Sequence, residues 1–246
     1  MPNKVLPFKP IQKNKRLFET VATEIKQLII KGAFKPGDKL PPEGELTQMF
    51  KVGRQTIREA MRLLEQCGFV EVVKGGGGGP IVKNRLLSTV NNLLLDVFQL
   101  EHITLEEITV TRFEIEKSIV PYAIKNAERS DIDALKENIS MAKEKISKAL
   151  IATDENIQFH NILANATKNQ ALAILMNVLM AALSDYHSRI PSNIGLSKRS
   201  IRRHEELLDA IVKKDNRLAL RIITKHIDEV GRQLQEFRNL LMNFGS

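Results

Sequence analysis

Three histidines and one asparagine in the C-terminal half of the chain have the residue types and spacing of a metal site. Asn156 and His160 are four residues apart, so on a helix their side chains share a face. His204 and His226 each fall within an apolar stripe of helical period, which predicts that both point into a core. A single inward histidine is usually a hydrogen-bonded core residue. Three of them on separate helices favour a metal ion, because imidazole binds zinc, nickel, copper and iron.

Arg112 is a second polar residue predicted to face inward. It shares the apolar stripe of its helix with Ile108 and Ile119. Arginine is rarely buried without a partner. The partner is either Glu116, four residues along the same helix, or the carboxylate of a bound ligand.

A basic helix in the N-terminal half points to nucleic acid. It is predicted from Arg54 to about Cys67, with Gly68 in the position of a helix-ending glycine. Its N-terminal and outer side carries Arg54, Gln55, Thr56, Arg58 and Arg62. Arginine can pair with guanine or bind phosphate, and glutamine can pair with adenine. The alternative is an ordinary solvated helix face.

Two further helices precede the basic helix. Apolar spacing predicts one from Leu17 to Ile30 and a shorter one after Pro42, with Leu46, Met49 and Phe50 on one face. The residues 51–53 then separate the short helix from the basic helix. This order places the N-terminal end of the basic helix where a recognition helix enters the DNA major groove.

A β-hairpin is predicted after the basic helix. The segment from Phe69 to Val73 is rich in β-branched residues, and Ile81-Val82 can pair with it. The glycines of residues 75–79 form a tip that can approach a groove closely, and Lys74 supplies positive charge. We therefore predict a winged helix-turn-helix, with Lys74 and Gly75 among the DNA-contacting residues.

The charge distribution agrees with this division. All of the formal net charge of +8 lies in residues 1–85, because acidic and basic residues balance over the rest of the chain. A basic module joined to a neutral one is the electrostatic pattern of a nucleic-acid-binding domain with a partner domain. The longest apolar run is shorter than the roughly 20 residues that a membrane span needs. With one cysteine and no signal-peptide pattern, we expect no membrane partner and a cytoplasmic protein.

The remaining chain shows helical periodicity and no convincing strand. We predict a mainly α protein with four parts: a flexible tail (1–15), a winged helix-turn-helix domain (16–83), a linker helix (84–101) and an all-α antiparallel bundle (102–246). About six helices are expected after the linker helix. Such bundles place metal and ligand sites between facing helices.

The N-terminal part resembles a known family. The segment LPPEGELTQMFKVGRQTIREAMRLLEQCGFVEVVKG is similar to the DNA-binding domain of the GntR family of bacterial transcription regulators. The sequence departs from the usual pattern at Gly44, where relatives often carry a basic or hydroxyl residue. It departs again at Gly53, where many carry serine or threonine.

The C-terminal part resembles the ligand-binding domain of the FadR subfamily of GntR regulators, of the FCD type. The resemblance rests on QFHNILANATKNQAL, HEELLDAI and ITKHIDEV. Members commonly hold a metal with one carboxylate and three histidines, which implies a zinc or nickel site at His160, His204 and His226. The expected aspartate is Asn156 here, which can ligate through its amide oxygen but brings no charge.

The same resemblance implies an effector. The matching arginine binds an effector carboxylate in similar regulators, which makes Arg112 the first candidate. His187 lies at helical spacing from Met180 and can line the same cavity, and Tyr186 is a further candidate. A small organic acid is the effector class that the family implies.

The sequence therefore predicts a homodimeric transcription factor that binds double-stranded operator DNA and is controlled by a metabolite. A dimer is expected because one recognition helix reads too few base pairs for specificity. We expect a repressor and not an enzyme. The alternatives are a regulator that senses the metal ion itself and a metalloenzyme with a nucleic-acid-binding domain.

Overall fold

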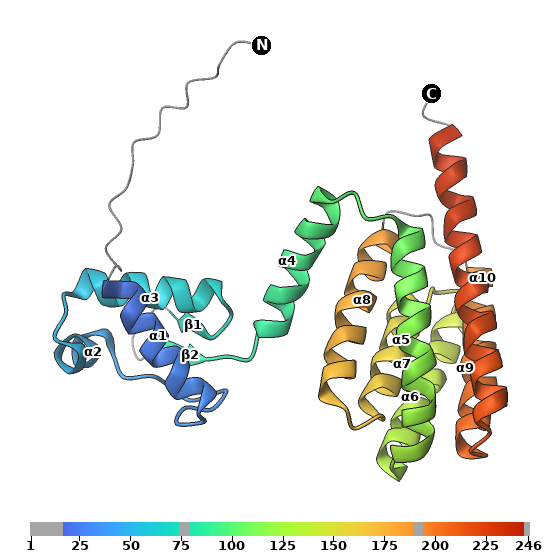
Figure 1. Ribbon diagram of the computed structural model, residues 1–246, viewed down its shortest axis with the longest axis horizontal. Coiled ribbons are helices and arrows are strands. Elements are labelled where there is room, and N and C mark those ends of the chain that lie inside the picture. Colours follow the sequence, from blue (N-terminus) through green and yellow to red (C-terminus); the bar gives the residue numbers. More distant parts are fainter. Residues whose placement is uncertain (1–16, 74–78, 189–193, 244–246) are drawn as a thin grey trace. The chain divides into compact units, whose positions relative to one another are not determined.

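The chain is described from a computed structural model, which places residues 17–73, 79–188 and 194–243. These residues form ten α-helices and one antiparallel pair of strands (Figure 1). The predicted fold class, a winged helix-turn-helix with an all-α domain, is confirmed. The chain divides into two compact units, Met1–Thr89 and Val90–Ser246, each with its own hydrophobic core.

Three helices form the core of the first unit. They are α1 (Leu17–Ile30), α2 (Glu43–Phe50) and α3 (Arg54–Gln66). Val21 and Ile25 of α1 pack with Ile57 and Leu64 of α3 in one buried cluster. Met49, expected to face inward on α2, is 67% exposed, because this two-turn helix buries only Leu46.

The turn between α2 and α3 does not use its glycine for the left-handed conformation. Lys51 ends α2 with φ 54° and ψ 42°, whereas Gly53 is extended with φ −69° and ψ 157°. Gly53 occupies the N-cap position of α3, and no side chain caps that end. The backbone N–H groups at the start of α3 therefore remain available to an anion such as a DNA phosphate.

The hairpin follows α3 directly. Strand β1 (Val70–Val73) pairs antiparallel with β2 (Gly79–Val82), and Val70 lies opposite Val82. A single bridge between Lys39 and Ile81 adds the segment before α2 to the other edge of β2. The predicted contact residues Lys74 and Gly75 lie outside the described residues.

Helix α4 (Leu86–Leu100) begins against the end of α3. Gly68 has φ +80°, and a Cβ atom there would lie 2.7 Å from Thr89 Oγ1 and 2.9 Å from the Arg85 carbonyl carbon. Only glycine combines this backbone conformation with so close a contact. Further along α4, Asn91 donates a hydrogen bond to Asn177 over 3.2 Å. The boundary between the two units falls inside this helix.

The second unit is a bundle of six described helices (Figure 1). They are α5 (Leu105–Asn126), α6 (Arg129–Ser147), α7 (Thr153–Asn165), α8 (Gln170–Ser188), α9 (Ile194–Val212) and α10 (Asn216–Asn243). Helix α7 contacts α5, α6, α8 and α9. Helix α10 packs on α5 and α9. None of the helices in the described part of the chain is long and apolar enough to cross a membrane.

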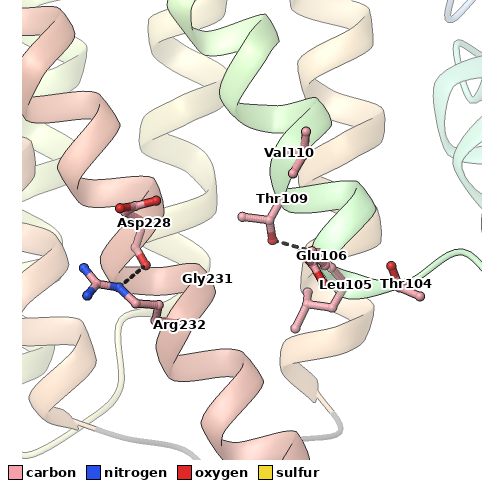
Figure 2. A pocket seen from close by; sticks show the side chains of 8 residues that line it. All are labelled: Thr104, Leu105, Glu106, Thr109, Val110, Asp228, Gly231 and Arg232. Carbon is pink, nitrogen blue, oxygen red and sulfur yellow. Dashed lines mark hydrogen bonds between the residues drawn. The ribbon is translucent and has the colours of Figure 1, made fainter.

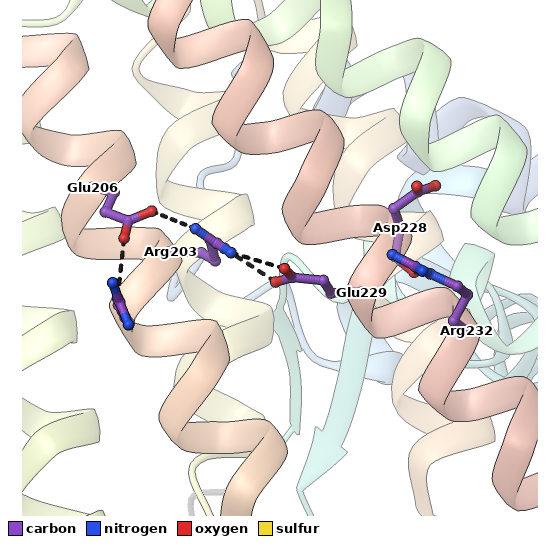
Figure 3. Close-up of polar contacts among 6 residues, drawn as sticks. Arg203, Glu206, Asp228, Glu229 and Arg232 are labelled. Atoms are coloured by element: carbon purple, nitrogen blue, oxygen red, sulfur yellow. Dashed lines mark hydrogen bonds and ion pairs between the residues drawn. The ribbon is translucent and has the colours of Figure 1, made fainter.

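An ion-pair network joins α9 to α10 (Figure 3). The Arg203 guanidinium donates from Nε and Nη2 to both carboxylate oxygens of Glu229, over 3.0 and 2.8 Å. Its Nη1 donates to Glu206 over 2.7 Å. Arg203 is adjacent to His204, and Glu229 is three residues after His226, so the network joins the two helices that carry these candidate metal ligands.

Candidate functional site

The outer face of α3 is basic and accessible. Arg54, Gln55, Arg58 and Arg62 are exposed, and Thr56 is partly buried at the first turn. The opposite face buries Ile57, Ala60 and Met61 in the first core, which fixes the direction of the polar face. The five residues of α3 that are predicted to contact DNA therefore lie on the helix face turned away from the core or at the first turn of the helix.

Two of these polar side chains have partners within the protein. Arg58 Nε donates to Glu43 Oε2 over 2.9 Å, with 57% and 36% of the two side chains exposed. Gln55 donates to Glu59 over 2.8 Å. These contacts engage Nε of Arg58 and Nε2 of Gln55, and they leave Nη1 and Nη2 of Arg58 without a described partner.

The three predicted histidine ligands meet in the interior of the second unit. His160 of α7, His204 of α9 and His226 of α10 are each no more than 2% exposed. One ring nitrogen from each lies within 4.8 Å of the others, a spacing that can surround one metal ion. Phe159 stacks on His204 with ring centres 3.8 Å apart and forms one wall of the cluster.

Two acceptors of this site have no hydrogen-bond partner among the described residues. They are Asn156 Oδ1 and His204 Nε2, both inaccessible to solvent. Buried polar atoms are normally satisfied, and an unpaired one indicates a missing water, ion or ligand. Asn156 lies one turn before His160 on α7 and is 8% exposed. The donor set therefore fits a divalent transition-metal ion.

Arg112 and Glu116 complete the cluster from α5. Both side chains are buried, and Arg112 Nε donates to Glu116 Oε1 over 2.6 Å. Glu116 Oε2 accepts from His160 Nδ1 over 2.9 Å. Arg112 Nη2 lies 2.6 Å from His160 Nε2, which itself lies 3.1 Å from His226 Nε2. Of the two partners open to Arg112 from sequence, the ion pair with Glu116 is formed.

Burial keeps the three imidazoles neutral. It lowers the pKa of His160 well below 6.5, and the Arg112 guanidinium lowers it further. Burial is also the largest cause of the lowered pKa of His204 and His226, followed by the neighbouring histidines and Arg112. Neutral imidazole is the form that binds a metal ion.

Of the other two predicted effector residues, Tyr186 is the one whose side chain is described. Tyr186 donates its hydroxyl hydrogen to the Ile103 carbonyl over 2.6 Å, which ties α8 to the segment before α5. His187 belongs to α8, but its side chain lies outside the described residues. The sequence indicates Glu116 only as a partner for Arg112. Its spacing of four residues from Arg112 was the signal that it also faces inward.

The four cavities described in the second unit lie away from the histidines. One, of about 250 Å³, lies between the start of α5 and α10 and is lined by residues that include Thr104, Asp228 and Arg232 (Figure 2). Its Arg232 donates to the Asp228 carbonyl. None of these four cavities is lined by His160, His204 or His226.

Comparisons with known proteins match both units. Residues 17–78 match the family of bacterial regulatory proteins named gntR, and residues 107–229 match the FCD domain. The Uxu operon transcriptional regulator of Escherichia coli (strain K12) is 28% identical over 92% of this chain and 89% of its own length. The Uxu operon regulator of Haemophilus influenzae is 30% identical, over 92% of this chain and 84% of its own length.

A repressor and a solved structure are also similar. The HTH-type transcriptional repressor NanR of Citrobacter rodentium is 26% identical over 88% of this chain and 85% of its own length. A Streptococcus agalactiae GntR structure has a TM-score of 0.68 at 24% identity, over 88% of this chain and 99% of that chain, and it supports the fold alone. The resemblance to GntR regulators with an FCD domain is therefore confirmed. This chain belongs to the GntR family of bacterial transcription regulators and carries a C-terminal FCD domain.

Proposed function

We propose that this chain is a homodimeric repressor of the FadR subfamily whose operator affinity is set by a small organic acid bound beside a metal ion. Arg54, Gln55, Thr56, Arg58 and Arg62 of α3 contact the operator, together with Lys74 and Gly75. Asn156, His160, His204 and His226 hold zinc or nickel, and Arg112 receives the effector carboxylate. Tyr186 and His187 are secondary effector candidates.

The observation that carries this proposal is the buried polar cluster of the second unit. A hydrophobic bundle core has no structural need for three histidines and an arginine in mutual contact, since buried polar groups cost free energy unless they are paired. Here Asn156 Oδ1 and His204 Nε2 remain unpaired. A metal ion satisfies both acceptors, and its positive charge recruits an anion.

The chemistry of each group follows from its surroundings. A bound ion supplies positive charge and open coordination positions to an anionic ligand. The neutral imidazoles and the Asn156 amide add no negative charge, so an acid is attracted more strongly than by a site with an aspartate ligand. Arg112 can bind a carboxylate with two parallel hydrogen bonds once it leaves Glu116.

Control of DNA binding requires coupling between the two units. An effector changes operator affinity only if it binds one arrangement of the DNA-binding units better than another. Helix α4 is the covalent connection, and we assign it the role of transmitter. Its start is fixed to the end of α3 through Gly68, and Asn91 bonds to α8.

The test begins with native mass spectrometry of the purified chain, which reads subunit number, metal and retained ligand together. A thermal-shift screen of hydroxy acids and sugar acids on zinc-loaded protein then selects an effector. Operator affinity is measured with and without a saturating concentration of that acid. We expect a change of about 5- to 150-fold, which corresponds to the usual coupling of about 1–3 kcal/mol.

Two outcomes contradict the proposal in different ways. Identical operator affinity with and without a bound acid rules out a ligand-controlled switch. A change in operator affinity on zinc addition alone, with no acid able to alter it, identifies the ion as the signal. The same measurements on the His204→Ala variant, which lacks one proposed metal ligand, are the control.

A further inference from the structure

Glu116 is a buried carboxylate with two specific contacts. It is 1% exposed, and each of its oxygens has a different partner: Oε1 accepts from Arg112 and Oε2 accepts from His160 Nδ1. A carboxylate oxygen can only accept, so His160 carries its hydrogen on Nδ1. The lone pair of His160 Nε2 then points into the histidine cluster.

The contacts of His160 Nε2 agree with this tautomer. Arg112 Nη2 lies 2.6 Å away and can only donate, so Nε2 must accept. His226 Nε2 lies 3.1 Å from the same atom, and the tautomer of His226 decides whether it carries a hydrogen there. A metal ion that binds His160 Nε2 must therefore displace the Arg112 guanidinium.

The charges of the cluster explain why Glu116 matters in this chain. In the arrangement described, Arg112 and Glu116 cancel, and the imidazoles and Asn156 are neutral. A divalent ion would add two positive charges to a site without a charged ligand at position 156. Glu116 is the one carboxylate in contact with a predicted metal ligand among the described residues of the cluster.

We propose that Glu116 replaces the missing ligand carboxylate of this metal site by acting through His160, and that Arg112 neutralises Glu116 while no ion is bound. Metal-ligating histidines are commonly oriented and made more basic by a carboxylate on the other ring nitrogen. When an ion binds, Arg112 is released from His160 Nε2 and becomes available to an anionic ligand. Glu116 is thus a positioning residue, and the inference rests on the metal site proposed above.

A purely structural role for the Arg112–Glu116 pair is the competing explanation. Removing Glu116 alone would leave Arg112 buried without a counter-charge, which is strongly destabilising. The comparison is therefore made in a background without that cation. Arg112→Met keeps the Glu116 carboxylate, whose only added counter-charge is then the zinc ion, and Arg112→Met/Glu116→Gln keeps an amide that can still accept from His160.

The measurement is zinc affinity by competition with a chromophoric chelator, after circular dichroism has shown that both variants are folded. We expect the double variant to bind zinc about 10- to 100-fold more weakly than Arg112→Met, the usual loss on removing such a carboxylate. Adding Asn156→Asp to the double variant should restore affinity, because a direct ligand charge replaces the indirect one. Glu114→Gln, an exposed change on the same helix, is the control and should leave affinity unchanged.

Equal zinc affinity in the two variants overturns the inference. Nitrogen NMR of histidines in the wild-type chain provides a test that needs no variant: zinc should bind Nε2 of His160 while Nδ1 keeps its hydrogen. Zinc on Nδ1 of His160 also overturns the inference. Failure of the wild-type chain to bind zinc at all instead contradicts the metal site of the proposed function.

Discussion

At the scale of single residues, Arg54 and Arg58 differ in what DNA binding must disrupt. Both are exposed on α3, but Arg58 already forms an ion pair with Glu43 at the start of α2. Arg54 is at the first position of α3, next to the uncapped N-terminal end. Arg54 therefore has the better access to a base edge, and part of any gain from Arg58 is offset by loss of its ion pair.

Replacing either arginine with alanine should weaken operator binding by about 1–3 kcal/mol, because each removes a charged contact in the groove. The loss should be larger for Arg54→Ala, which should also relax base preference. Fluorescence anisotropy at one fixed salt concentration, on operator and scrambled DNA, measures both effects. Arg129→Ala removes the same charge from an exposed site in the second unit and is the control. Unchanged affinity in both α3 variants would refute the assignment of α3 as the recognition helix.

Asn156 is the residue that distinguishes this site from one with a charged ligand. Asn156→Asp should bind zinc about tenfold more tightly, or better, because a carboxylate is added directly to the site. The same change should weaken an anionic effector by lowering the local positive charge. Calorimetric titration of the effector into metal-free, zinc-loaded and Asn156→Asp protein separates the two effects. Equal effector affinity in all three would mean that the ion has a structural role only.

At the scale of elements, the ligands depend on the pairing of α9 with α10. Arg203 contacts Glu229 with two hydrogen bonds and is 19% exposed. Its neighbour Arg202 is 79% exposed and contacts only Glu206 among the described ion pairs. Both arginines contact Glu206 within α9, so their comparison isolates the inter-helix pair of Arg203 with Glu229.

Arg203→Gln should lower the free energy of unfolding of the second unit by about 1–2 kcal/mol, since it removes a bidentate, partly buried pair. It should also weaken zinc binding, because His204 and His226 lose their fixed separation. Arg202→Gln should stay within about 0.5 kcal/mol of wild type. Urea unfolding followed by circular dichroism, with zinc titration of both variants, is the measurement. Equal behaviour of the two variants would show that the network does not position the ligands.

At the scale of the whole molecule, the two units differ in how they respond to acid. All five histidines of the chain lie beyond Thr89, so the first unit contains none. In the metal-free second unit, burial lowers the pKa of His160, His204 and His226 well below 6.5. The unfolded chain therefore binds protons that the folded unit excludes.

The sign of the effect follows from linkage. The free energy of unfolding of the second unit is not reduced by this effect above about pH 6.5. It falls as the pH falls from about 6.5 toward the lowered pKa values of the folded unit, because only the unfolded chain binds protons there. The three histidines together change the free energy of unfolding by at most about 4 kcal/mol per pH unit. Calorimetry of chelator-treated protein between pH 7 and 5 should show the melting transition of the second unit moving down relative to that of the first. Parallel movement of both transitions would contradict neutral burial of the histidines.

Local patterns in the sequence were sufficient to predict much of this protein. Hydrophobic periodicity predicted α1 at its observed bounds, and the start of α3 at Arg54. The uneven charge separated the basic part of the chain from the neutral part. These features depend on neighbours within a few turns, where the spacing of side chains along a helix is known in advance.

Tertiary structure decided what the sequence left open. Met49 fits an apolar stripe but is exposed, because α2 is short and packs through Leu46 and Phe50. The periodicity indicated that Arg112 and the histidines face inward, but not which atoms meet. Glu116 and Arg112 lie 44 and 48 residues from His160 along the chain, and only the packing of α5 against α7 brings Glu116 to His160 Nδ1 and Arg112 to His160 Nε2. Contacts between distant segments depend on how whole helices pack, and residue spacing within one helix carries no information about that.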